Sequence, residues 1–445
     1  MNIARARADF PALRPHPGRP PVAYLDSACM SLVPDSVLRA MEEYYSDYPG
    51  CAGRSLHRFA EEVSRRYDAA RGAFANFVGT RPSGNIVFLR NATEAINLVA
   101  SGLDWKKGDR VLVSDQEHNS NLVVWQRLQR ERGIRLEILP LSVDGSWDGE
   151  VLERALSRKI RLVSLFHTSN LDGRSLPIRE IAERAHDRGA RTLFDGCQAA
   201  PHQSVNFDRV GTDFYAISAH KMLGPTGTGI LVGTPEALSG LRPLVVGGET
   251  VEWTTLADHR LRPPPYRFEA GLQNYGGIIG AHAGLRYLER VGLETVERTQ
   301  RALNREVTEA LSELGRVHVL GPQNVRDRPS IFGFTIDGID PHDAALFLDE
   351  GWGVLVRSGM HCVHSWYERR GLTGSVRASF YLYNNRRDVA ALVQGVRELV
   401  QRVPLRTNGA QSKPRRGREA PRGAAAGRKC TSTTRGIRDR SNTSS

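Results

Sequence analysis

The sequence has few of the features that mark secreted, membrane-spanning or metal-clustered proteins. Five cysteines among 445 residues are scattered and form no Cys-x-x-Cys pair, which argues against a disulfide framework and against a metal site. No apolar run approaches the roughly 20 residues that span a bilayer. The first residues, MNIARARADFPALRP, lack the apolar centre of a secretory signal. These absences predict a cytoplasmic protein.

The positive charge is concentrated at the C-terminal end. From residue 405 the chain holds eleven Lys or Arg and two acidic residues, which is +9 of the total of +12. A stretch of Arg, Gly, Ser, Thr and Ala cannot bury a core. We therefore expect residues 405–445 to be a disordered tail with weak affinity for nucleic acid. A specific RNA or partner-docking role remains an alternative.

The remainder alternates short apolar runs with amphipathic stretches, a pattern typical of βα units and a mostly parallel sheet. We expect a large αβα domain over residues 24–284 and a smaller α/β domain over residues 285–404, with residues 1–23 packing against the smaller one. In the smaller domain, RPSIFGFTIDG predicts a strand and RDVAALVQGVRELVQRV predicts an amphipathic helix.

Four apolar runs end in polar residues, which makes them candidates for one shared site. Ligands of open α/β sheets bind beyond the carboxyl ends of the strands. The candidates from these ends are Glu117 and His118; His167, Ser169 and Asn170; Asp195 and Gln198; and Ser218, His220 and Lys221.

A candidate anion site lies in RNATEAINLVASGL. Asn91 and Glu94 have capping-box spacing, although the box prefers Ser or Thr at its first position. The free N–H groups of such a helix start bind phosphate, and the hydroxyl of Thr93 adds a donor.

Lys221 lies where an apolar run meets a glycine-rich turn, AISAHKMLGPTGTG. A partly buried lysine is a usable amine nucleophile. Together with Asp195 and a phosphate site, it fits pyridoxal phosphate, whose aldehyde a lysine holds and whose pyridine nitrogen a carboxylate keeps protonated. The alternative is a lysine that reaches solvent from a strand end.

The series of motifs resembles class V aminotransferase-like, fold-type I enzymes that use pyridoxal phosphate. It is most similar to group II (Suf-type) cysteine desulfurases and the related selenocysteine lyases. The resemblance covers residues 24–389, and its motifs, in order, are YLDSACMSLVP, GRSLHRFA, NATEAINLVA, EHNSNLVVWQ, FDGCQAAPH, SAHKMLGPTGTGILVG, YRFEAGLQNYGGIIG, VLVRSGMHC and RASFYLYNNRRDV.

The resemblance implies a role for each matching residue and a homodimer. Lys221 would hold the aldehyde, Asp195 would pair with the pyridine nitrogen, and Gln198 with the phenolic oxygen. His118 would stack on the ring and help to move protons. The resemblance also assigns the phosphate to Ala92, Thr93, Ser218 and His220, and the substrate to Arg377, Asn170 and His57.

Cys362, in RSGMHCVHSW, distinguishes the desulfurase interpretation from other reactions of this cofactor. In the relatives a cysteine here attacks the sulfur of bound L-cysteine, keeps it as a persulfide and lets L-alanine leave, and a sulfur-acceptor protein then takes the sulfur. Arg357 and His361 lie near it in sequence and favour a thiolate. The alternative is a small buried apolar residue.

Some positions differ from the usual pattern. Met30 lies in a stretch that is usually small, Leu272 replaces a threonine that reaches the partner's phosphate, and Met360 replaces a histidine. Because these changes are expected to surround the substrate, another class V reaction remains open: selenocysteine lyase, epimerase or aminotransferase. A non-catalytic binding protein is a further alternative, against which the intact Lys221 and Asp195 argue.

Overall fold

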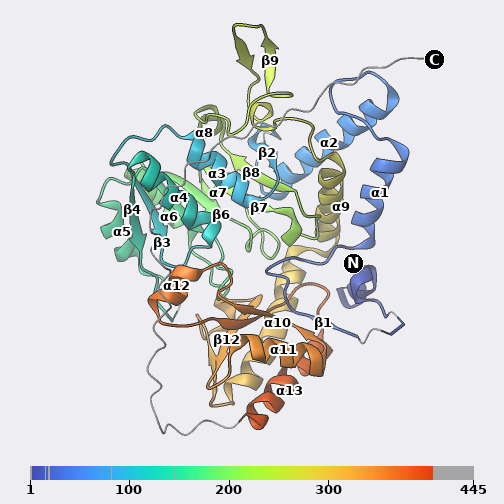
Figure 1. Ribbon diagram of the computed structural model, residues 1–445, viewed down its shortest axis with the longest axis vertical. Helices are drawn as coiled ribbons and strands as arrows, with labels where there is room; N and C mark the ends of the chain where they lie inside the picture. Colours follow the sequence, from blue (N-terminus) through green and yellow to red (C-terminus); the bar gives the residue numbers. More distant parts are fainter. Residues whose placement is uncertain (1–2, 16, 19–20, 82, 145, 404–445) are drawn as a thin grey trace, which may run out of the picture. The chain divides into compact units, whose positions relative to one another are not determined.

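The computed structural model describes residues 3–403 apart from 16, 19, 20, 82 and 145 (Figure 1). The predicted tail, residues 405–445, lies outside the described residues. None of the described helices is long and apolar enough to cross a membrane.

A seven-stranded sheet organises the larger part of the molecule. Its order is β2-β8-β7-β6-β5-β3-β4, and only β8 runs against its neighbours. The predicted α/β class with a mostly parallel sheet is therefore confirmed. The strands are β2 (Ile86–Leu89), β3 (Arg110–Ser114), β4 (Arg135–Leu139), β5 (Leu162–Phe166), β6 (Arg191–Asp195), β7 (Phe214–Ser218) and β8 (Gly229–Gly233).

Helices cover both faces of this sheet, so its strands are apolar on both sides. In β3, Val111 and Val113 pack with α3 and α4 on one face, whereas Leu112 joins the core on the other. The first face carries α3 (Ala92–Gly102), α4 (Asn119–Arg132) and α8 (Pro235–Ser239). The second carries α2 (Arg58–Phe77), α5 (Gly149–Leu156), α6 (Ile178–Asp187) and α9 (Tyr275–Val291), with α1 (Asp35–Asp47) against α9.

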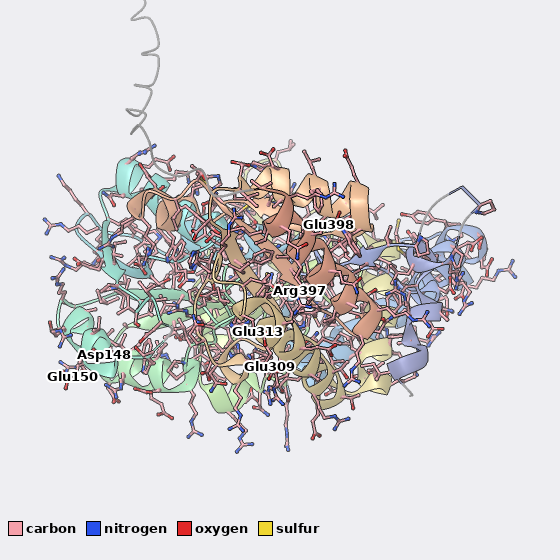
Figure 2. The ribbon with its side chains drawn as sticks, turned by 90° about the horizontal axis from the view of Figure 1, so that it is seen from below. Asp148, Glu150, Glu309, Glu313, Arg397 and Glu398 are labelled. Atoms are coloured by element: carbon pink, nitrogen blue, oxygen red, sulfur yellow. The ribbon has the colours of Figure 1, made fainter. Side chains whose placement is uncertain are left out.

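A second sheet is antiparallel, with the order β11-β12-β15-β14. Its strands are β11 (Val317–Val319), β12 (Ile331–Ile336), β14 (Arg357–Gly359) and β15 (Ser375–Ser379), and the helices around it are α10 (Leu293–Ser312), α11 (Pro341–Trp352), α12 (His364–Arg369) and α13 (Arg386–Arg402). Helices α10 and α13 pack side by side, and Arg397 of α13 lies 4.0 Å from Glu313, just beyond the end of α10 (Figure 2).

The N-terminal segment joins this second sheet region. Strand β1 (Ala23–Tyr24) pairs in parallel with β13 (Val354–Leu355), and Asp26 forms a bridge with Ser379 at the end of β15. The residues after β1 are thereby held against a part of the chain more than 300 positions away. On the opposite side of the molecule, the hairpin of β9 (Val251–Thr254) and β10 (His259–Leu261) projects outward (Figure 1).

Candidate active site

Polar residues lie together at the edge of the large sheet where its parallel strands end. β6 ends on Asp195 and β7 on Ser218, while His118 and Asn170 follow β3 and β5. Glu117 is fully buried behind them, where burial raises the pKa of its carboxyl group to about 8 and Ser114 donates to it at 2.6 Å.

A cavity of about 210 Å³ opens at this edge. The predicted site residues that line it are Ala92, Thr93, His118, Asn170, Asp195, Ser218, His220, Lys221, Cys362 and Arg377. The structure thus brings together most of the residues that the sequence indicated, from both sheets.

Two predicted residues lie elsewhere in the described chain. Gln198 is buried beside the cavity, and its Nε2 donates to the carbonyl of Ala28 at 2.7 Å. His57 is exposed at the start of α2, where its Nδ1 accepts from the N–H of Ala60 at 3.4 Å. Neither residue lines the cavity itself, although Gln198 contacts the cavity wall through Ala28, and their roles stay predictions.

Lys221 is placed by a tight turn that follows β7. The 3-10 turn Ala219–Lys221 ends the strand, and the N–H of Gly224 returns to the carbonyl of Ala219 at 2.9 Å. A Cβ at Gly224 would lie 2.9 Å from that of Ala219, so this return needs glycine. Lys221 is therefore half-buried in the cavity wall, close enough to His118 for its charge to act on the imidazole.

His118 is a neutral imidazole at pH 7. Burial, together with the positive charge of Lys221, lowers its pKa to about 4. Its Nδ1 accepts the N–H of Ser120 at 3.1 Å. In the tautomer that this bond requires, the proton is on Nε2.

The start of α3 is a candidate anion site in the same cavity. The N–H of Ala92 donates to Ser218 Oγ at 2.9 Å, and the N–H of Glu94 donates to Asn91 Oδ1 at 3.0 Å. Glu94 itself accepts from the N–H of Arg90 at 2.6 Å, so the expected spacing gives the cap without the reciprocal bond of a capping box. Thr93 lines the cavity between the two occupied donors.

Arg377 lies at the junction of the two sheets. Its guanidinium is 2 % exposed; Nη1 donates to the carbonyl of Asn170 at 2.8 Å and Nη2 to Asp26 Oδ1 at 3.0 Å. Within the described residues its Nε has no hydrogen-bond partner. Because a buried cation with an unpaired donor is costly, it is suited to receive a carboxylate.

Cys362 lies on a tightly held turn between β14 and α12. His361 and Cys362 both have positive φ angles, +48° and +60°, which residues other than glycine rarely adopt. The carbonyl of His361 accepts from Asn170 Nδ2 and that of Cys362 from the N–H of Asn119, both at 2.7 Å. These bonds fix a conformation that holds the half-buried thiol in the cavity wall.

Two residues of the cavity region, Cys29 and Asp26, were not assigned a site role from the sequence. Cys29 lines the cavity, and Asp26 binds Arg377. Arg357, expected beside Cys362, also lines the cavity, but its Nη1 donates to Cys29 Sγ. Asp26 and Cys29 belong to the quoted motif YLDSACMSLVP, but short-range pattern does not show that this turn meets residues 330 or more positions later. Of the departing residues, Met30 and Leu272 are exposed and Met360 packs beside Trp366 and Tyr367. None of these three residues lines the described cavity, and the expectation that they surround the substrate stays a prediction.

Comparison with known proteins gives a consistent result. The family model for aminotransferase class-V matches residues 23–392. A probable cysteine desulfurase of Halalkalibacterium halodurans is 37 % identical over 89 % of this chain and 97 % of its own. A cysteine desulfurase of Klebsiella pneumoniae is 34 % identical over 90 % of this chain and 98 % of its own.

Solved structures agree with these relatives. The apo structure of a cysteine desulfurase from Thermococcus onnurineus has a TM-score of 0.85 at 36 % identity and covers 89 % of this chain and 98 % of that one. The cysteine desulfurase CsdA from Escherichia coli has a TM-score of 0.83 at 31 % identity, with 91 % and 100 % coverage. The family and fold expected from the motifs are confirmed, and the chain belongs to the aminotransferase class-V family, among relatives named cysteine desulfurases.

Proposed function

We propose that this protein is a pyridoxal-phosphate-dependent cysteine desulfurase. It converts L-cysteine to L-alanine and keeps the removed sulfur as a persulfide on Cys362. The observation that carries the proposal is that Lys221, Asp195, Arg377 and Cys362 line one cavity. An amine, a buried carboxylate, a carboxylate-binding guanidinium and a thiol are the four groups that this reaction needs.

The cavity residues fit the cofactor. Lys221 would hold its aldehyde carbon, buried Asp195 its pyridine nitrogen, and Thr93 with the start of α3 its phosphate, beside Ser218 and His220. Gln198 has an Oε1 without a hydrogen-bond partner among the described residues, so its amide has capacity left for a ligand beside the ring. When bound, the cofactor supplies an electron sink that makes the α-proton of an amino acid removable.

The protein's own groups bind and orient the substrate. Arg377 would receive the substrate carboxylate through Nε and Nη2, and the backbone carbonyl of Asn170, which accepts from Arg377 Nη1, limits rotation of the guanidinium. A carboxylate held this way directs the side chain of L-cysteine toward the remaining wall, which includes Cys362. Positioning of this kind accounts for a large share of enzymatic rate enhancement.

His118 and Cys362 would carry out the steps that belong to the protein. Neutral His118 holds its proton on Nε2 and can deliver it inside the cavity at neutral pH. The Cys362 thiolate attacks the substrate sulfur: a Cys362 Sγ–S bond forms, the substrate C–S bond breaks, and its electron pair stays on the carbon skeleton that leaves as alanine.

We propose a homodimer as the working form and a separate sulfur acceptor. Leu244, Val245 and Leu272 are exposed by 41 to 66 % and line one groove of about 460 Å³. Exposed apolar side chains gathered in one groove are typical of a subunit interface. The four cysteines among the described residues are free, which supports a reducing, cytoplasmic location.

The test uses the protein loaded with pyridoxal phosphate and given L-cysteine without reductant. We expect alanine, and a Cys362 peptide heavier by one sulfur, about 32 Da. Borohydride reduction before digestion should fix the cofactor on the Lys221 peptide. Lys221→Ala should abolish both the alanine and the persulfide. Cys362→Ser should abolish the persulfide, whereas Cys51→Ser should change neither product. Cofactor on Lys221 without alanine from L-cysteine would reject the substrate and favour another class V reaction.

A further inference from the structure

The cavity has two accessible thiols. Cys29, Cys197 and Cys362 all line it. Cys197 is 5 % exposed, and burial raises the pKa of its thiol to about 12, so it stays protonated at neutral pH. Cys29 and Cys362 are half-buried, and both can meet solvent and a ligand in the cavity.

Cys29 is held in a defined position. The turn after β1 is closed by the N–H of Cys29, which donates to the carbonyl of Asp26 at 3.0 Å. The preceding residue, Ala28, is held at both ends of its backbone. Its N–H donates to Ser379 Oγ at 2.9 Å, and its carbonyl accepts from Gln198 Nε2 at 2.7 Å. The backbone of this turn is therefore tied to both sheets, and the cysteine is fixed against the cavity.

The environment of the Cys29 sulfur is that of a nucleophile. Nη1 of Arg357 donates to Cys29 Sγ at 2.8 Å. An arginine beside a partly exposed sulfur is a setting in which protein cysteines react, whereas structural cysteines lie among apolar atoms. Arg357 belongs to β14, which leads directly into the turn that carries Cys362. Strand β14 thus carries the Arg357 guanidinium that contacts Cys29, and it also leads into the turn that positions the Cys362 thiol.

The surrounding wall has polar capacity beyond the Arg377 Nε that we assign to the substrate carboxylate. Nδ1 of His361, a residue 3 % exposed that lines the cavity, has no hydrogen-bond partner among the described residues. Buried polar atoms in this state are costly unless a ligand satisfies them.

We propose that Cys29 is a second sulfur carrier, which takes the terminal sulfur from the Cys362 persulfide. The inference rests on the proposed function. The Cys29 thiolate attacks the terminal sulfur, a Cys29 Sγ–S bond forms, and the Cys362 Sγ–S bond breaks. Cys362 leaves as a thiolate, ready for the next substrate, and the proton lost by Cys29 goes to solvent. The exchange is neutral in electrons, so no oxidant or reductant takes part.

The test maps sulfur on each peptide after the loaded enzyme has reacted with L-cysteine and thiols have been blocked with excess iodoacetamide before unfolding. Trypsin cuts after Arg39, Arg357 and Arg369, so Cys29 and Cys362 appear on different peptides. We expect one added sulfur, about 32 Da, on both peptides of the wild type. In Cys29→Ser the Cys362 persulfide should persist, and the release of sulfide to dithiothreitol after the first turnover should slow.

Controls separate the relay from its alternatives. Cys51 is also half-buried but does not contribute to the described cavity wall, so sulfur on Cys51 would mean scrambling and overturn the assignment. Sulfur on Cys29 in Cys362→Ser would mean direct transfer from the substrate and also overturn it. A Cys362 persulfide with an unmodified Cys29 would reject the relay and leave the desulfurase proposal standing. Absence of both alanine and persulfide would reject both proposals.

Discussion

Arg377 Nη2 donates a 3.0 Å hydrogen bond to Oδ1 of Asp26, a residue 351 positions earlier in the chain. The pair joins the turn after β1 to the middle of β15. Burial raises the pKa of Asp26 although the guanidinium opposes this, so desolvation outweighs the ion pair here. The pair nevertheless fixes the guanidinium at the cavity, which is what a carboxylate-binding group requires.

The conservative variant Arg377→Lys tests this arrangement. A lysine cannot form two parallel bonds to a carboxylate, and a charged hydrogen bond is worth about 1.5–3 kcal/mol. We expect the KM for L-cysteine to rise roughly 10-fold to 100-fold, since about 1.4 kcal/mol is tenfold. The visible absorbance of the lysine-bound cofactor should remain. Arg386→Lys, at an exposed position at the start of α13, is the control, and an unchanged KM in Arg377→Lys would contradict the assignment.

His118→Asn should lower kcat without loss of bound cofactor. A positioned proton donor contributes roughly 100-fold or more. Because the pKa of His118 is lowered to about 4, the wild-type kcat/KM should show no titration of this group near pH 6.5 and should fall only as the pH approaches 4. A rate profile between pH 5.5 and 7.5 checks this. A wild-type limb near 6.5 that disappears in the variant, but not in exposed His259→Asn, would refute it.

Buried histidines should make the fold sensitive to acid. Burial lowers the pKa of both His167 and His202 to about 3, whereas the unfolded chain takes up protons near 6.5. The contribution of these two histidines to the free energy of unfolding is therefore fully present above pH 6.5. It is lost as the pH falls toward 3, by up to about 1.4 kcal/mol per pH unit for each group. Urea unfolding at pH 7.5, 6 and 5 measures the slope. His202→Gln should have a shallower slope than wild type, and His259→Gln the same slope.

Gly229→Ala should destabilise the protein and weaken cofactor binding. A Cβ at this position would lie 2.3 Å from the Cα of Asn91, which caps α3. Overpacking of this kind costs about 1–3 kcal/mol and would displace the helix start that we assign to the phosphate. Gly351→Ala in α11 meets nothing within 4 Å and should be neutral or mildly stabilising. Equal melting temperatures and cofactor affinities for the two variants would contradict the prediction.

Val245→Asp should dissociate the proposed dimer. Val245 is 55 % exposed and lines the same groove as Leu272, and a charge there would be desolvated in an interface. Sedimentation velocity over a range of concentrations should show dimers for wild type and monomers for the variant. Leu346→Asp, on α11 and 58 % exposed, is the matched control. A monomeric wild type would reject the dimer itself.

Features encoded in short stretches could be read directly. The runs before Asp195 and Ser218 are strands of a mostly parallel sheet, and Asn91 caps a helix as its spacing indicates. The family followed from ordered motifs around Lys221. The predicted boundary at residue 284 remains a prediction.

Contacts between distant segments could not be read. Nothing in the turn containing Cys29 specifies that Arg357 binds its sulfur, and nothing near His57 specifies that it is exposed at the start of α2. The motif around Met360 likewise does not specify that this side chain packs beside Trp366.

The sequence by itself determined the α/β class and the polar residues at the strand ends, including Lys221, because alternation, capping and glycine-rich turns act over a few residues. Tertiary structure alone decided that Asp26, in the turn after β1, binds Arg377 at the site and that three cysteines share one cavity. The physical reason is that parallel β1–β13 pairing and packing of the second sheet bring together residues whose separation along the chain leaves no local pattern.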